Sequence, residues 1–355
     1  AAENINQYLD FLCYLDYIYR NSLQFLLFQG LLIIFFILLL KYHFLKNYLP
    51  TKISKMKKLL LLTIVTLFTN FAKAQWQQTN GPHGGNIYCF ASSGSNIYVG
   101  NSNGISLTTD NGISWTSLNN GLPYSSISSI TISGPDMYAA TGSGVYKSTN
   151  NGNDWFAIGL PGKQISSITI SGGNIFAGTS SGEIFMTPNS GSSWSLLKNG
   201  LNWVNSIVSD GADIYAAAWA GVYHSNNNGT TWTLLNNGLG SNLIYELLIN
   251  GTKIFAATYD GVFLSVDKGA NWSPTNNGLT STIISSLATD GTNIFAGSNS
   301  GVFLSTNNGS NWIPVQNGLT FPISSLHING TDIFAGTAGG AHGRGVFLSK
   351  NNGAS

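Results

Sequence analysis

Acidic side chains that could transfer protons are few beyond Gln75. From that residue onward the sequence holds nine Asp and two Glu. Two carboxyl groups at a suitable separation can hydrolyse a glycosidic bond, one as the acid and the other as base or nucleophile. Glu246 and Asp260 lie close in sequence and Glu183 lies elsewhere, but the sequence does not fix the distances between them. A hydrolase or lyase that uses these residues is kept as the alternative function, and no catalytic residue is predicted.

Side chains that bind metals or act as nucleophiles show no useful spacing. The four histidines after Gln75 are His83, His224, His327 and His342, and their separations suggest neither a metal site nor a catalytic triad. Cys89 is the one cysteine in this part of the chain, so it can form no disulfide within it. We predict a buried, unreactive thiol, no metal and no cofactor.

Aromatic side chains offer a different chemistry, because their flat faces bind sugar rings or peptide side chains. Trp203 and Trp219 break the regular spacing of the other tryptophans and mark a predicted recognition surface. The other predicted members of this surface are Tyr124, Tyr259, Phe321 and Arg344. The alternative interpretation, that the rings only pack beneath loops, stays open.

These side chains must be positioned by a repeated unit. Seven tryptophans recur at intervals of 38 to 40 residues. They are Trp76, Trp115, Trp155, Trp194, Trp232, Trp272 and Trp312. Each unit holds four short apolar runs separated by Gly, Asn and Ser, and four strands in about 40 residues is the spacing of a propeller blade.

The number of units predicts a closed ring of seven blades. Inner strands are expected to begin near Ile87, Ile127, Ile165, Val204, Ile244, Ile283 and Ile323. The seventh unit stops before its Trp strand, so the strand at Trp76 is expected to supply the missing edge. Runs such as 293–297 and 301–304 are apolar or small on both alternating faces. Sheets of this kind must be covered on both sides, as stacked blades are.

The turns before the tryptophans resemble the Asp-box, or BNR, pattern Ser/Thr-x-Asp-x-Gly-x-Thr-Trp. The acidic position is held by Asp110, Asn150, Asn189, Asn227, Asp267, Asn307 and Asn351. The resemblance covers 75–355 and implies an all-β, seven-bladed propeller of four-stranded antiparallel blades. The chain thus resembles the sortilin-like and photosystem-assembly-factor-like propellers, and also secreted repeat proteins of bacteria that use the type IX export route. Because Asn replaces Asp in five copies, we expect a structural role for this position, in which a short Asx side chain binds backbone N–H groups.

Enzymes with similar boxes set limits on the activity. A sialidase is expected to hold its substrate carboxylate with three arginines. Arg344 is the one arginine after Gln75, which argues strongly against sialidase activity. Xyloglucan-hydrolysing enzymes of this type place their cleft between two propellers, whereas this chain predicts one.

The region before the repeats carries an export signal. A basic stretch at 56–58 precedes an apolar run at 59–68 and an Ala-x-Ala site at 72–74, the order of a secretory signal peptide. Cleavage would leave Gln75 as the first mature residue. We therefore expect a secreted or cell-surface protein of a Gram-negative-type bacterium.

Residues 1–55 do not begin with Met and are rich in Phe, Leu, Ile, Tyr, Asn and Lys. We interpret them as a non-native upstream extension, and the competing interpretation is a membrane helix near 25–40. The C-terminus, which ends within a repeat, is interpreted as truncated.

The net charge of the repeat region limits the classes of partner that it can bind. From Gln75 onward six Lys and one Arg face nine Asp and two Glu, a formal net charge of −4, so the basic surface that nucleic acids require is missing. The sequence thus predicts a secreted, monomeric, non-catalytic scaffold or binding module. It would recognise glycan or protein through loops that differ between blades, without nucleic acid and without a membrane in the mature form.

Overall fold

A computed structural model of the chain describes residues 76–82, 85–188, 190–319, 321–338, 345–351 and 353. The chain divides into two compact units, Ala1–Ala72 and Lys73–Ser355, and the described residues all lie in the second. The predictions for 1–55, for 56–74, and for His83, Asn189, His342 and Arg344 fall outside the described residues.

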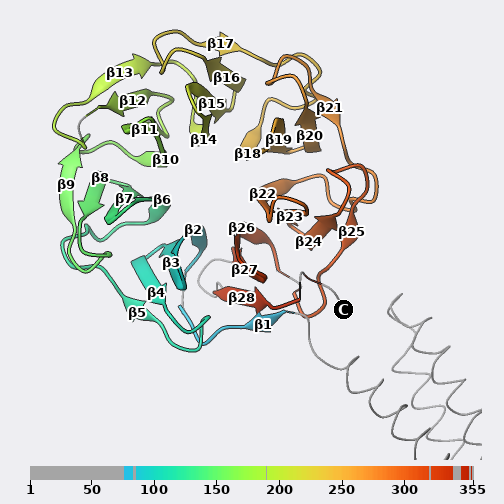
Figure 1. Cartoon of the computed structure of the whole chain (residues 1–355), viewed down its shortest axis with the longest axis horizontal. Coiled ribbons are helices and arrows are strands. Elements are labelled where there is room, and N and C mark those ends of the chain that lie inside the picture. Colours follow the sequence, from blue (N-terminus) through green and yellow to red (C-terminus); the bar gives the residue numbers. More distant parts are fainter. Residues whose placement is uncertain are drawn as a thin grey trace, which may run out of the picture. The chain divides into compact units, whose positions relative to one another are not determined.

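The second unit is a ring of seven four-stranded antiparallel sheets, which confirms the predicted fold (Figure 1). The first, innermost strands of the blades are β2 (Ile87–Ser93), β6 (Ile127–Ser133), β10 (Ile165–Ser171), β14 (Val204–Asp210), β18 (Ile244–Asn250), β22 (Ile284–Thr289) and β26 (Ile323–Asn329). The second strands are β3 (Asn96–Asn101), β7 (Asp136–Thr141), β11 (Asn174–Thr179), β15 (Asp213–Ala218), β19 (Lys253–Thr258), β23 (Ile294–Ser298) and β27 (Asp332–Thr337).

The third strands are β4 (Gly104–Thr108), β8 (Gly144–Ser148), β12 (Ile184–Thr187), β16 (Gly221–Ser225), β20 (Gly261–Ser265), β24 (Gly301–Ser305) and β28 (Val346–Ser349). The outermost strands are β5 (Thr116–Ser117), β9 (Phe156–Gly159), β13 (Ser195–Lys198), β17 (Thr233–Leu234), β21 (Ser273–Pro274), β25 (Ile313–Pro314) and β1 (Gln77–Gln78). Six of the seven predicted starts of inner strands agree with the structure. In the sixth blade the inner strand begins at Ile284 instead of Ile283.

The ring closes as the sequence predicted. Strand β1 pairs with β28, so the order in the last blade is β1-β28-β27-β26. Trp76 is buried, and its indole N–H donates to the carbonyl of Val315 at 2.6 Å. The first described segment thus completes the seventh blade and covers an edge that would otherwise be unpaired.

The core lies between neighbouring blades. In β11, β15 and β19 every residue after the first is buried, whichever face its side chain takes. The sequence prediction of sheets covered on both faces is therefore confirmed. The outermost strands β17 and β21 are exposed at both residues.

The repeated tryptophans hold blades together. Trp155, Trp272 and Trp312 each donate their indole N–H to a carbonyl in or beside the outer strand of the preceding blade, at 2.7 to 3.0 Å. Trp232 instead donates to Gly229 in its own turn. The tryptophans thus link neighbouring blades, a contact that the sequence did not predict.

The antiparallel order gives the ring two faces. We call the face with the connections from second to third strand and from one blade to the next the upper face. The lower face carries the turns between first and second strands and between third and fourth strands.

The Asx turns of the lower face share one hydrogen-bond pattern. In the turn before Trp272, Asp267 Oδ1 accepts the backbone N–H of Asn271 at 2.9 Å, and Ser265 Oγ accepts that of Gly269 at 2.8 Å. In the turn before Trp312, Asn307 Oδ1 accepts the N–H of Asn311 at 2.9 Å. Asp and Asn make the same contact, so the contact does not require a negative charge.

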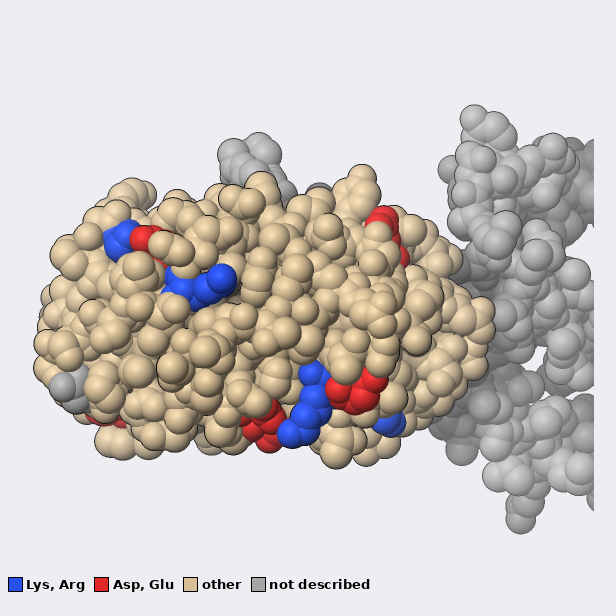
Figure 2. Space-filling model, turned by 90° about the horizontal axis from the view of Figure 1, so that it is seen from above, with Lys and Arg blue, Asp and Glu red and all other residues tan. Residues whose placement is uncertain are grey.

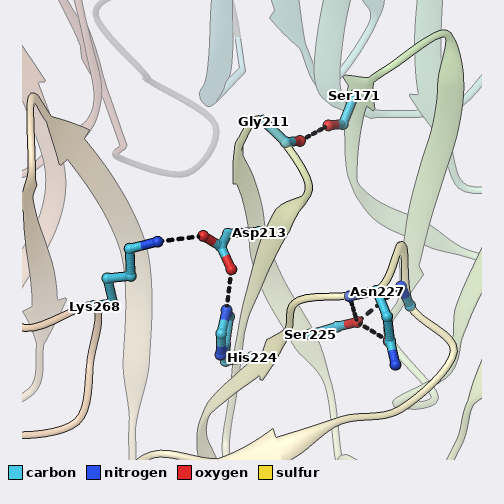
Figure 3. A network of polar contacts seen from close by, with 8 residues as sticks. Ser171, Gly211, Asp213, His224, Ser225, Asn227 and Lys268 are labelled. Atoms are coloured by element: carbon cyan, nitrogen blue, oxygen red, sulfur yellow. Dashed lines mark hydrogen bonds and ion pairs between the residues drawn. The ribbon is translucent and has the colours of Figure 1, made fainter.

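These turns also join neighbouring blades. Lys268 donates to Asp213 of the preceding blade at 2.9 Å, and Asp213 contacts His224 at 2.7 Å (Figure 3). The hydrogen bond from Lys268 is the main reason that the pKa of Asp213 is lowered. His224 is thereby part of a polar network on the lower face.

Candidate functional site

Trp203 and Trp219 form a stacked pair on the upper face of the fourth blade. Trp203 lies in the connection that leads into β14, and Trp219 lies in the turn between β15 and β16. Their ring centroids are 5.7 Å apart and the ring planes differ by 8°. Trp203 is 36% exposed and Trp219 49% exposed, so both rings offer surface to a partner.

The backbone beneath this pair is in a conformation that side chains rarely adopt. Asn202 and Trp203 have φ values of 52° and 53°, and a bulky residue in the left-handed region is unfavourable. The backbone N–H of Trp219 donates to the carbonyls of Asn202 (3.1 Å) and Trp203 (3.3 Å), which holds this conformation. Local strain of this kind concentrates at functional sites.

The other predicted aromatic residues lie in connections of other blades. Tyr124 is 94% exposed before β6, and Tyr259 is 47% exposed between β19 and β20. Phe321 is half-buried and packs against Phe347 of its own blade, with ring centroids 6.0 Å apart. The structure therefore places Trp203 against Trp219, while Phe321 contributes to the core.

The three candidate carboxylates have different surroundings. Glu183 forms an ion pair with Lys163 (2.8 Å) and accepts a hydrogen bond from Ser181. The hydrogen bond from Lys163 is the main cause that lowers its pKa, so Glu183 is unsuited to act as an acid. Asp260 is exposed in the turn after β19, and its backbone N–H donates to Thr258 Oγ1. Glu246 faces the centre of the ring.

A cavity of about 360 Å³, called the central channel below, lies at the centre of the ring and is lined by the first strands of all seven blades. Each of these strands has a bulge at its second residue. A bulge redirects side chains, and both the second and the third residues line the channel. The second residues are Tyr88, Ser128, Ser166, Asn205, Tyr245, Ser285 and Ser324. The third residues are Cys89, Ser129, Ser167, Ser206, Glu246, Ser286 and Ser325.

The third residues connect each blade to the next. The hydroxyl oxygens of Ser167, Ser206 and Ser286 accept the backbone N–H of Ile207, Leu247 and Leu326 at 3.0, 3.3 and 2.9 Å. Glu246 replaces serine in this ring, and its Oε2 accepts the N–H of Leu287 at 2.7 Å.

Burial changes the protonation of the channel side chains. It raises the pKa of Glu246 to about 7, although hydrogen bonds from Leu287 and Ser286 oppose the shift. It also raises the pKa of the Cys89 thiol to about 12, which agrees with an unreactive cysteine. Cys89 itself is half-buried in the channel wall and not fully buried as predicted. His327 stacks on Phe90 with centroids 6.0 Å apart, and burial lowers its pKa to about 4.

Metal-binding clusters and membrane-spanning helices are both missing from the described residues. These residues contain no group of three or more His, Cys, Asp or Glu side chains arranged to hold a metal ion. Within the same ranges, no helix has the length and apolar character needed to cross a bilayer.

Residues 69–202 match the family described as the DUF6242 beta propeller domain. No curated protein sequence matches the chain significantly. Many solved structures share the fold.

The extracellular domain of BT4673 from B. thetaiotaomicron is 17% identical with a TM-score of 0.64, and the match covers 78% of this chain and 40% of that domain. The chain thus spans less than half the length of that protein. YCF48 bound to D1 peptide is 16% identical with a TM-score of 0.63, over 78% of this chain and 97% of YCF48. The GH74 xyloglucanase from Xanthomonas campestris is 14% identical with a TM-score of 0.62, over 79% and 54% of the two chains. At these identities the likeness shows the propeller fold alone.

Sequence reasoning missed the channel, although the signal was present. Four inner strands begin with Ile-Ser-Ser followed by Ile or Leu, at 127–130, 165–168, 284–287 and 323–326, whereas the fifth reads Ile-Tyr-Glu-Leu at 244–247. Aligning the repeats at this position would have singled out Glu246. The ion pair of Glu183 with Lys163 depends on loop geometry and has no comparable signal.

Proposed function

We propose that the propeller is a non-catalytic, extracellular binding module that recognises glycan or protein through the stacked Trp203–Trp219 pair. The observation that carries this proposal is the pair itself: two exposed, parallel indole rings on a strained backbone, in the one blade where both upper connections carry tryptophan. Large aromatic side chains contribute much of the binding energy at interfaces.

The low proportion of charged residues favours recognition by shape and apolar contact. Figure 2 shows that charged side chains are sparse on the side of the molecule in view, where most of the surface belongs to uncharged residues. Charged residues make up 8% of the sequence. A partner with a flat apolar face, such as a sugar ring or an aromatic or aliphatic side chain, fits the indole surfaces.

The fold neighbours support both ligand classes and an extracellular location. YCF48 was solved with D1 peptide, a GH74 member is a xyloglucanase, and the BT4673 domain is extracellular. The predicted signal at 56–74 agrees with export. The surroundings of Glu183 and Glu246 favour binding over hydrolysis, because one is neutralised by Lys163 and the other is engaged with Leu287.

The test is a screen of the protein on glycan and peptide arrays, followed by Trp203→Ala with Trp219→Ala. We expect the double variant to weaken binding of the best ligand at least tenfold, because an aromatic hot spot contributes roughly 2 kcal/mol or more. Phe156→Ala is the matched control, since Phe156 is similarly exposed (48%) but lies on outer strand β9.

Unchanged affinity in the double variant would overturn the proposed surface. Release of reducing sugar from a bound polymer would overturn the non-catalytic assignment and favour the hydrolase or lyase alternative.

A further inference from the structure

Glu246 is the one carboxylate among the residues that line the central channel, and that lining contains no lysine or arginine. The other titratable groups of the lining are Tyr88, Cys89, Tyr245 and His327. Of the strands packed against β18, β22 brings no titratable residue, and β15 brings Tyr215, whose ring stacks on His224. The charged residues of the other packed positions are Asp210 on β14, Asp213 on β15 and Lys253 on β19. These three lie at the lower ends of their strands, away from Glu246, since Asp210 pairs with Asp213 and Asn250 with Lys253, whereas Glu246 pairs with Ala257.

The link between blades does not explain this carboxylate. Three serines at the equivalent position accept the same backbone N–H from the next blade, as described above. A glutamate adds a charge that burial disfavours and that the serine of the repeat would not carry. The carboxylate is therefore an extra group in a structure that closes equally well without it.

The chemistry around Glu246 is that of a cation site. Tyr245 precedes it, Ser286 of the next blade forms a hydrogen bond with it, and Tyr88, Phe90 and further serines line other parts of the same channel. A carboxylate, hydroxyl lone pairs and aromatic faces together match an ammonium group, which has three N–H donors and a positive charge. The channel, at about 360 Å³, has room for an alkyl chain behind that group.

We infer that the central channel binds a primary alkylammonium group at Glu246, either a small amine or a lysine side chain of a partner. The carboxylate pairs with the ammonium group and accepts its charge-assisted hydrogen bonds. The aromatic faces of the channel cover the alkyl chain of the amine. The net charge of −4 from Gln75 onward adds a general attraction for cations. This site does not depend on the Trp203–Trp219 surface.

The experiment is calorimetric titration at pH 8 with n-butylamine and Nα-acetyl-lysine methylamide, and with Nα-acetyl-norleucine methylamide as the uncharged analogue. Both amines should bind if the channel accepts a free amine, and the lysine derivative alone should bind if it selects a peptide side chain. The norleucine derivative should not bind. The backbone amide resonance of Leu287, whose N–H donates to Glu246, should shift on titration.

Glu246→Gln should weaken amine binding at least tenfold while keeping an oxygen that accepts the Leu287 N–H. Glu183→Gln is the matched control, because it removes another upper-face carboxylate outside the channel, and it should leave amine affinity unchanged. In the unsubstituted protein, affinity should rise about tenfold from pH 6 to pH 8, as a carboxyl group with pKa near 7 ionises; in Glu246→Gln it should not.

Absence of amine binding at pH 8, equal binding of the norleucine derivative, or equal affinity in Glu246→Gln would each overturn the inference. Trp203→Ala with Trp219→Ala separates the two sites. If that variant loses its glycan or peptide ligand but retains amine binding, the two surfaces act independently.

Discussion

The fifth and sixth blades each have four strands and share the hydrogen-bond pattern of the turn between third and fourth strands, yet they present different side chains to the channel. The sixth blade has Ser285 and Ser286 where the fifth has Tyr245 and Glu246. Below, Asp267 and Asn307 make equivalent contacts in equivalent turns. The parts that specify the fold are therefore repeated, and the parts that differ are free to serve recognition.

The largest expected effect separates a structural tryptophan from a recognition tryptophan. Trp312 is buried, and its indole N–H donates to Thr275 of the preceding blade. Trp312→Ala should lower the free energy of unfolding by about 3–5 kcal/mol. Trp219→Ala should change it by less than about 1 kcal/mol. Urea denaturation followed by circular dichroism measures both, and equal losses would remove the distinction between the two sets of tryptophans.

Glu246→Gln tests the cost of the charge that distinguishes the fifth blade. Because folding raises the pKa of Glu246 from 4.5 to about 7, the folded state binds more protons than the unfolded state between these values. The unsubstituted protein should lose stability relative to the variant as the pH rises from 4.5 to 7, by about 1–3 kcal/mol. Denaturation at pH 4 and pH 8 checks this, and a pH-independent difference would contradict it.

His327 should show the opposite pH dependence. Folding lowers its pKa from 6.5 to about 4, so the unfolded state binds the extra proton. Compared with His327→Phe, which keeps a ring against Phe90, the unsubstituted protein should lose about 1–2 kcal/mol as the pH falls from 6.5 to 4. Parallel acid titrations of the two proteins provide the measurement. If both respond alike, the imidazole is not the acid-sensitive group.

The smallest effect is expected in the repeated turns. Asp267→Asn should shift the midpoint of thermal unfolding by less than about 2 °C, because Asn307 makes the same contact in the next turn. Ser305→Ala is the informative contrast, since Ser305 Oγ accepts the buried N–H of Gly309 at 2.8 Å. An unsatisfied N–H at that position should cost about 1–3 kcal/mol. A large loss in Asp267→Asn would show that charge matters in this turn.

Much of the fold could be read from the sequence because the repeats restate one another. The spacing of seven tryptophans gave the number of blades, and the unit that lacked its last strand pointed to Trp76 as the closing edge, as β1 now shows. Repetition averages out the ambiguity of any single short apolar run.

The site was less accessible to sequence reasoning for physical reasons. Trp203 and Trp219 stood out in the sequence because they depart from the spacing of the other tryptophans. Their stacking depends on the left-handed backbone at Asn202 and Trp203, and a left-handed conformation cannot be predicted from residues other than glycine. The orientation of Glu246 follows from a bulge opposite Ala257. A bulge is set by contacts between strands, so a pattern of alternating residues does not reveal it.

The hydrogen bonds that third residues accept from the next blade have a consequence for how such a molecule changes over generations. In each of them a side chain of one blade meets a main-chain N–H of the next, and every residue except proline provides that N–H. A unit copied into the ring, or altered at its third residue, can therefore find a partner whatever side chains its neighbour carries. One blade can acquire a glutamate while those beside it remain unaltered, and new specificity can arise one repeat at a time.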